Sequence, residues 1–277
     1  MTPNPELTDT RPSAPGQPAS GDAAPSPNAV SPARTRRAVF YKWLTYLVLA
    51  PLIALATIFF GSISLVCSLW DSSGRQQHSI SRLWARTLLL FSLSPVRVEG
   101  AEKLRLHEAA VYASNHLSLY DTPLLFGRLP FQFRILAKQG LWKVPFIGWH
   151  LNRSGQVPVD NSSARSTIAG LSRGVQTLKD GMPLVIFPEG GRAADGITRR
   201  FVAGAAWMAI RAQVPLVPVT LAGTYELLPM HTYHLNPSPL TIIFGDPIPT
   251  AGLTTRDADA LTERLREIIT RTCMQRR

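Results

Sequence analysis

The feature that most constrains this chain is a stretch of 28 residues, from Trp43 to Trp70, that contains no charged side chain. As an α-helix the stretch would be about 42 Å long at ~1.5 Å per residue, whereas the hydrocarbon core of a bilayer is about 30 Å thick. Aromatic residues stand at both of its ends, as they do at membrane interfaces. The stretch therefore predicts a helix in contact with lipid, with a buried core helix as the alternative.

Basic residues flank the apolar stretch on both sides, so the positive-inside rule does not orient it; they are Arg34, Arg36, Arg37 and Lys42 before it, and Arg75, Arg82 and Arg86 after it. Apolar residues from Ile80 to Phe91 then recur at helical spacing, with arginines on another face. This pattern is typical of an interfacial amphipathic helix, or of a helix that packs on a domain. We expect two helices that are anchored mostly in one leaflet and that return the chain to its starting side.

The composition supports a membrane-associated protein over a nucleic-acid binder. The net charge is +11, which favours anionic partners, but only 17% of residues are charged and 45% are hydrophobic. No nucleic-acid recognition motif occurs, so we expect no nucleic-acid partner. The two cysteines, Cys67 and Cys273, form no disulfide framework and fit a reducing compartment. Residues 1–33 carry eight prolines and no aromatic residue, which predicts a disordered tail.

After Pro95 the pattern changes, and short apolar runs alternate with stretches of helical periodicity. We expect strands near residues 96–98, 110–112, 133–136, 156–159, 183–187, 216–221 and 240–244, and helices over 162–180, 201–212 and 257–273. This alternation predicts an α/β domain with a mainly parallel central sheet covered by helices. The expected organisation is thus a tail (1–33), membrane-anchoring helices (34–94) and an α/β domain (95–277).

A histidine and an aspartate, His116 and Asp121, follow the strand expected near residues 110–112. Ligands of α/β proteins bind at the carboxyl ends of the strands. A neutral imidazole can accept a proton near neutral pH, and a carboxylate at its second nitrogen stabilises the imidazolium that forms. The pair can therefore activate a substrate hydroxyl, although the pair alone is more often a loop histidine beside a capping aspartate.

A second group of polar residues, Glu189, Gly190, Gly191 and Arg192, follows the most apolar of the expected strands. Glycine lets a backbone approach a ligand closely, and an arginine offers two donors to a phosphate. Lys138 ends another expected strand and can point into the same crevice. The alternatives are an ordinary turn with a solvated Glu and Arg, and a solvated lysine at the end of a strand.

Several common sites have no counterpart in the sequence. It contains no Gly-x-Ser-x-Gly elbow, no P-loop and no Gly-x-Gly-x-x-Gly fingerprint. His231 and His234 are three residues apart but have no nearby set of Cys or carboxylate ligands. We therefore expect no metal and no bound cofactor.

Four blocks in order resemble those of the 1-acylglycerol-3-phosphate (glycerolipid) acyltransferases: residues 115–121 (Asn-His-x4-Asp), 155–160, 187–192 (Phe-Pro-Glu-Gly-Gly-Arg) and 214–219. Ala137-Lys138 and the Val-Pro-Phe-Ile-Gly run that begins at Val144 also look familial, and the likeness covers roughly residues 75–250. The resemblance implies the glycerolipid acyltransferase fold. It also implies a membrane-bound enzyme that moves an acyl group from a thioester to the sn-2 hydroxyl of 1-acylglycerol 3-phosphate, which gives phosphatidic acid for phospholipid synthesis.

The resemblance implies that His116 is the general base and that Asp121 orients it. It also implies a direct transfer with no acyl-enzyme intermediate. The residues implied in substrate binding are Asn115, Lys138, Glu189, Gly190 and Arg192. The co-substrate is acyl-CoA or acyl carrier protein, the acceptor is a lysophospholipid, and the implied location is the inner (plasma) membrane with the catalytic domain on the cytoplasmic side.

Two departures from the family pattern bear on the acceptor. Asn161 follows Asp160 where the family has arginine, so Arg153 or Arg165 would take over that contact with phosphate. Gly191 stands where threonine is common. The alternatives are an acyltransferase for another lysophospholipid or for an amino-acid-containing lyso-lipid, and a lipid-binding protein without catalysis, against which the intact His116, Asp121 and Glu189 argue.

Overall fold

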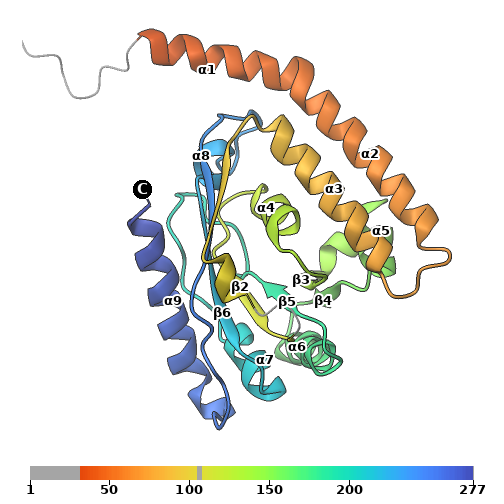
Figure 1. The fold of residues 1–277 in the computed structure, drawn as a ribbon, viewed down its shortest axis with the longest axis vertical. Helices are drawn as coiled ribbons and strands as arrows, with labels where there is room; N and C mark the ends of the chain where they lie inside the picture. Colours follow the sequence, from red (N-terminus) through yellow and green to blue (C-terminus); the bar gives the residue numbers. More distant parts are fainter. Residues whose placement is uncertain (1–31, 105–107, 277) are drawn as a thin grey trace, which may run out of the picture.

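The protein is described from a computed structural model that covers residues 32–104 and 108–276. The tail predicted over residues 1–33 lies outside this part except for its last two residues. The described chain begins with helices α1 (Pro32–Leu44) and α2 (Ala50–Cys67), which a π-helical turn (Thr45–Leu49) joins into one helical run. A tight connection then leads into α3 (Arg75–Phe91), which runs beside α2 (Figure 1).

The π-helical turn coincides with a proline. Pro51 lies in the first turn of α2 and has no N–H to donate to the carbonyl four residues earlier. The hydrogen-bond ladder just before it accordingly takes the wider π spacing, which is a known source of helix bends. The run α1–α2 arches over the rest of the molecule in Figure 1.

The central sheet has seven strands in the order β1-β7-β6-β2-β5-β3-β4. The five strands from β6 to β4 are parallel, and β7 pairs with β6 in the antiparallel sense. The mainly parallel α/β sheet that the sequence predicts is thereby confirmed. The strands are β1 (Val96–Glu99), β2 (Val111–Ser114), β3 (Arg134–Lys138), β4 (Val157–Val159), β5 (Leu184–Ile186), β6 (Leu216–Ala222) and β7 (Leu240–Phe244).

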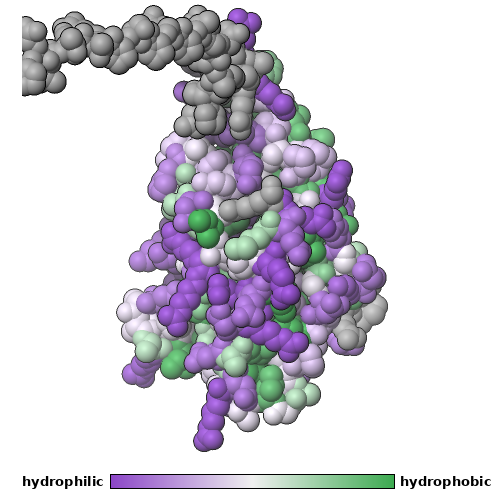
Figure 2. Space-filling view, turned by 90° about the vertical axis from the view of Figure 1, so that its left-hand side faces the viewer, coloured by the Kyte–Doolittle hydropathy of each residue, from purple (hydrophilic) through white to green (hydrophobic). Residues whose placement is uncertain are grey.

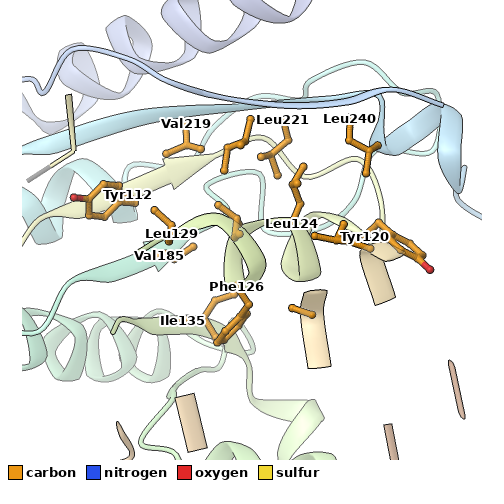
Figure 3. Packing of buried hydrophobic residues seen from close by; sticks show 14 of the residues in the cluster. Tyr112, Tyr120, Leu124, Phe126, Leu129, Ile135, Val185, Val219, Leu221 and Leu240 are labelled. Atoms are coloured by element: carbon orange, nitrogen blue, oxygen red, sulfur yellow. The ribbon is translucent and has the colours of Figure 1, made fainter. Parts of the chain in front are cut away.

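Helices cover both faces of the sheet because its central strands are apolar on both sides. Tyr112 and Val185 point into one core, with α3 and α4 (Figure 3), whereas Val111 and Leu184 point into the other, with α6, α7 and α9. Strands buried on both faces are typical of parallel sheets. The helices after α3 are α4 (Asp121–Arg128), α5 (Ile147–Arg153), α6 (Ala164–Lys179), α7 (Gly204–Ala212), α8 (Thr224–Leu227) and α9 (Ala258–Met274).

The apolar helical run is attached to the α/β domain near both of its ends. Near the start, the Leu235 N–H donates to the Thr45 hydroxyl over 3.0 Å. Near the end, the Ser64 hydroxyl lies 2.8 Å from Nδ1 of His150 on α5. Residues 36–67 have a mean hydropathy of 2.2 in their most apolar window, only 11% of which is buried. The run thus lies along the domain while its outer face stays apolar and uncovered, which indicates membrane association.

Candidate active site

The residues expected to form the site follow three neighbouring parallel strands. His116 lies two residues beyond the end of β2, Glu189 lies three residues beyond the end of β5, and Lys138 ends β3. The sheet order β2-β5-β3 places these carboxyl ends next to each other. The polar groups therefore gather at the edge of the sheet where α/β proteins bind ligands.

His116 and Asp121 form a hydrogen-bonded pair. Nδ1 of His116 lies 2.9 Å from Oδ2 of Asp121, whose side chain is fully buried, whereas 19% of the His116 side chain is exposed. The same Oδ2 atom accepts the N–H groups of Leu117 at 2.6 Å and Ser118 at 2.8 Å. The loop wraps around one carboxylate oxygen, which explains the separation of five residues. This arrangement assigns a proton to Nδ1 and leaves Nε2 as the acceptor.

Phe187 holds the imidazole from its other side. The rings of Phe187 and His116 are stacked, with centroids 4.0 Å apart and planes 16° apart. Aromatic stacking of this kind adds about 0.5–1.5 kcal/mol beyond burial. No sequence pattern predicted this role for Phe187; the only local indication is its position directly after β5 and before Pro188.

Glu189 holds the backbone of the loop between β2 and α4, residues 115–120, which we call the histidine loop. Oε1 accepts the His116 N–H at 2.8 Å, and Oε2 accepts the Arg199 N–H at 3.0 Å. Burial raises the pKa of Glu189 above its ordinary value, while these two N–H groups oppose the shift. The Ala193 N–H also donates to the carbonyl of His116 over 3.1 Å. Both carboxylate oxygens are thus used within the protein, so Glu189 braces the site.

Asn115 also has a structural role, because its side chain links the end of β2 to β6. Its Nδ2 donates to the Leu221 carbonyl over 2.9 Å, and its Oδ1 accepts the Leu221 N–H at 2.8 Å. The side chain is completely buried. It ties the end of β2 to β6, and both polar atoms of the side chain are bonded within the protein. The contact of Asn115 with substrate that the resemblance implies stays a prediction.

The side chains of the two predicted phosphate-binding cations, Lys138 and Arg192, form no ion pair with a carboxylate in the described part of the chain. Arg192 is partly exposed and Lys138 is exposed, and neither side chain has a hydrogen bond or ion pair with another residue in the described part of the chain. Gly190 is exposed, with φ +68° and no neighbour within 4 Å of a Cβ built on it. The loop after β5 is therefore open on its outer side, where an anion can approach Arg192. Arg153 and Arg165 lie near β4 at the far edge of the sheet.

An apolar cavity of about 280 Å³ lies beside the histidine loop. It reaches Thr122, the residue after Asp121, and extends between α2, α3, β3 and α5. Its apolar wall includes Phe60, Ile80, Trp84, Phe126, Ile135, Ala137, Leu141, Phe146, Ile147 and Leu151. A cavity so lined excludes charged groups and accepts hydrocarbon.

Within residues 32–104 and 108–276, no cluster of three His, Cys, Asp or Glu side chains is arranged to hold a metal ion.

Comparison with known proteins identifies the family and the fold of the chain. The sequence model of the Acyltransferase family matches residues 95–222. The crystal structure of the 1-acyl-sn-glycerophosphate (LPA) acyltransferase PlsC from Thermotoga maritima superimposes with a TM-score of 0.73 at 24% identity, over 86% of this chain and 97% of that one. The two proteins therefore share a fold.

Sequence relatives carry the same family name. A 1-acyl-sn-glycerol-3-phosphate acyltransferase from Chlamydomonas reinhardtii is 30% identical over 253 residues, which are 90% of this chain and 72% of the relative. The chloroplastic enzyme of Arabidopsis thaliana is 35% identical over 175 residues, or 62% of this chain. The chain spans about half of this relative (48%) and of its Brassica napus counterpart (50%). The chain belongs to the 1-acyl-sn-glycerol-3-phosphate acyltransferase family.

Proposed function

We propose that this protein transfers a fatty acyl group from acyl-CoA or acyl carrier protein to the sn-2 hydroxyl of 1-acylglycerol 3-phosphate, which yields phosphatidic acid for phospholipid synthesis. The observation that carries the proposal is the His116–Asp121 pair, with Nδ1 bound to the carboxylate at 2.9 Å and the ring partly exposed. The family of the chain and the names of its relatives, which are 1-acyl-sn-glycerol-3-phosphate acyltransferases, support the same reaction.

In the proposed reaction Nε2 of His116 removes the proton of the acceptor hydroxyl while the oxygen attacks the thioester carbonyl. Asp121 stabilises the imidazolium that forms. When the carbonyl re-forms, the C–S bond breaks, and the imidazolium returns its proton to the thiolate that leaves. The acyl group passes directly from sulfur to oxygen. Phe187 and Glu189 support the histidine without contacting the substrates.

The acceptor phosphate has a matching pair of cations. Arg192 and Lys138 lack internal partners among the described residues and follow strands on the same side of β2. A guanidinium binds phosphate oxygens in pairs, and an ammonium adds charge. We assign the phosphate to these two residues and the acyl chain to the apolar cavity beside Thr122.

The membrane attachment fits an enzyme whose acceptor and product are lipids and whose donor is soluble. Because Thr45 and Ser64 both bind the α/β domain, α2 lies along the domain rather than carrying it at one end. We therefore propose a one-leaflet anchor formed by residues 34–94 and an acyltransferase domain over 95–277, on the cytoplasmic side of the inner (plasma) membrane. Tags at both termini should then be accessible to protease from one side only, and access from opposite sides would refute the arrangement.

A panel of acceptors tests the substrate assignment. The full chain in lipid vesicles is given a labelled acyl-CoA or acyl carrier protein together with one lyso-lipid at a time. We expect 1-acylglycerol 3-phosphate to turn over fastest. Faster turnover of another lysophospholipid or of an amino-acid-containing lyso-lipid would favour the alternative acceptor, which the asparagine at position 161 motivates.

Replacement of the proposed base tests the chemistry. His116→Ala is expected to lower kcat about 10²–10⁴-fold, the usual contribution of a general base. Unchanged turnover would show that His116 is not the base, whichever acceptor is preferred.

A further inference from the structure

The segment between β3 and β4 carries an unusual amount of exposed apolar surface. It consists of a 3₁₀ turn (Gln139–Lys143) and helix α5, and we refer to residues 139–153 as the β3–β4 element. Large exposed apolar groups that lie together mark a binding surface. Five of its apolar side chains are 41–56% exposed: Leu141, Val144, Phe146, Ile147 and Trp149.

The backbone of the β3–β4 element is built to hold this surface outward. Phe146 has φ +60° and ψ −51°, and the Ile147 N–H donates to the Pro145 carbonyl over 2.7 Å. This is the rare, strained form of the γ-turn. A Cβ on Gly148 would lie 2.1 Å from the Trp142 carbonyl oxygen, so α5 packs directly on the 3₁₀ turn. The element is therefore a compact unit that presents the Phe146 ring to the outside.

The unit is fixed beside the end of the apolar helix. His150 on α5 lies 2.8 Å from the Ser64 hydroxyl of α2 through Nδ1, and 3.2 Å from the Ser81 hydroxyl of α3 through Nε2. Trp142 and Trp149 line one surface hollow together with Leu65 and Leu69 of the α2 end. Figure 1 shows α5 next to the turn between α2 and α3. The exposed apolar surface of the element is thus continuous with that of α2.

The β3–β4 element itself carries only basic charged residues. No acidic residue occurs between Asp121 and Asp160, whereas Lys138 directly precedes the β3–β4 element and Lys143 and Arg153 lie within it. Tryptophan with nearby Lys and Arg is the composition of a membrane interface, and such cations are attracted to anionic lipid. The opposite side of the molecule, which carries α9, is mostly hydrophilic (Figure 2).

We propose that the β3–β4 element is a second membrane-inserted unit, which places Phe146 and Trp149 among the lipids of an anionic bilayer beside α2. Leu141, Phe146 and Ile147 also form part of the cavity wall. The bilayer then borders directly on the wall of the cavity to which we assign the acyl chain. The proposal rests on the proposed function in one respect only, namely that the chain is attached to a membrane.

The test places an environment-sensitive fluorophore on single cysteines in the full chain, with Cys67→Ser and Cys273→Ala as background. Trp149→Cys and Val144→Cys report on the β3–β4 element, and Glu267→Cys on the exposed face of α9 is the matched control. Each protein is reconstituted in vesicles of phosphatidylcholine and phosphatidylglycerol. Quenching is measured with aqueous iodide and with doxyl groups on the lipid acyl chains. No turnover is measured, so an error in the acyltransferase assignment would not affect the result.

We expect labels at 144 and 149 to be quenched by the doxyl lipids and to be several-fold less accessible to iodide than the label at 267. Equal iodide quenching at all three positions would overturn the proposal. Protection from iodide without doxyl quenching would also overturn it, because the surface would then be covered by protein, such as a second copy of the chain. Because Val144 lies directly after the 3₁₀ turn and Trp149 lies on α5, a fold disturbed by one substitution leaves the other as the reporter.

Discussion

At the scale of single residues, the site depends on one carboxylate oxygen. Oδ2 of Asp121 is within hydrogen-bond distance of three donors, from His116, Leu117 and Ser118. It therefore sets both the tautomer of the imidazole and the path of the loop. Phe187 and Glu189 complete the support from the neighbouring strand β5.

Asp121→Asn is expected to keep the fold and lose most of the activity. An amide at this position does not hold the proton on Nδ1 and does not stabilise the imidazolium, so kcat should fall about 10²–10⁴-fold. The pH–rate profile and the thermal midpoint of the variant are to be measured together. Loss of activity with a midpoint close to wild type supports the orienting role, whereas wild-type turnover would contradict it.

At the scale of elements, the N-terminal helices form part of the cavity and are more than an attachment. Phe60 and Gly61 of α2 face Ile135 and Ala137 of β3 across it. The helices α2 and α3 are held to α5 by the bonds of His150. A change in α2 can therefore alter the space for an acyl chain without touching the histidine.

Gly61→Phe is expected to fill part of the cavity. A Cβ on Gly61 meets nothing within 4 Å, so the substitution is tolerated by the helix. Turnover of long-chain acyl donors should fall more than that of short-chain donors, as measured by kcat/KM for a series of chain lengths. The control is Ile58→Phe on the outer face of α2, where the side chain is 59% exposed. An equal loss for all chain lengths in Gly61→Phe would argue against acyl binding here.

The stability of the protein should fall at acid pH because a buried histidine, His78, packs α3 against the domain. His78 is 3% exposed, and its Nε2 lies 3.1 Å from the carbonyl oxygen of Phe131. Burial, together with the positive charge of Arg82, lowers the pKa of His78 from 6.5 to about 4. Between these values the unfolded chain binds a proton that the native protein does not, so stability is lost as the pH falls from about 6.5 toward 4, by up to about 3 kcal/mol.

The measurement is the free energy of unfolding in detergent at pH 7 and pH 5. His78→Gln removes this proton linkage and should flatten the pH dependence relative to wild type, whatever its effect on stability at pH 7. A pH dependence as steep in the variant as in wild type would rule out His78 as its source.

At the scale of the whole molecule, charge is distributed unevenly. Acidic residues are absent between Asp71 and Glu99 and between Asp121 and Asp160, the stretches that hold α3 and the β3–β4 element. On α9, by contrast, arginines alternate with acidic residues, as in the Glu263–Arg266 pair. The stretches that form α3 and the β3–β4 element therefore carry basic residues only, whereas α9 carries charges of both signs.

Arg36→Gln with Arg37→Gln should weaken the preference for anionic membranes. At ~1 kcal/mol for each cation near the surface, the double variant loses about 2 kcal/mol, or roughly 30-fold in partition. The quantity measured is the ratio of transfer from detergent into phosphatidylglycerol and phosphatidylcholine vesicles. Arg264→Gln with Arg271→Gln, exposed on α9, is the matched control. Equal losses in both double variants would mean that net charge alone, and not its location, governs binding.

The sequence by itself determined whatever depends on residues close together in the chain. Short apolar runs such as Leu184–Ile186 predicted strands because both of their faces are apolar. The spacing of His116 and Asp121 was a weak signal by itself, and the resemblance of the four blocks to a known family made the pair the favoured interpretation. An uncharged stretch after a basic cluster predicted the long apolar helix. These are properties of periodicity, turn length and composition, which act locally.

Only the tertiary structure decided which distant groups meet. The bonds of Asn115 with Leu221, of Ser64 with His150 and of Thr45 with Leu235 join residues 106, 86 and 190 positions apart. The bonds of Asn115 use both polar atoms of its side chain within the protein, and the other two bonds hold the apolar helix along the domain. Such contacts follow from the order of strands in the sheet and from packing on both of its faces, which depend on the whole chain at once and have no local pattern.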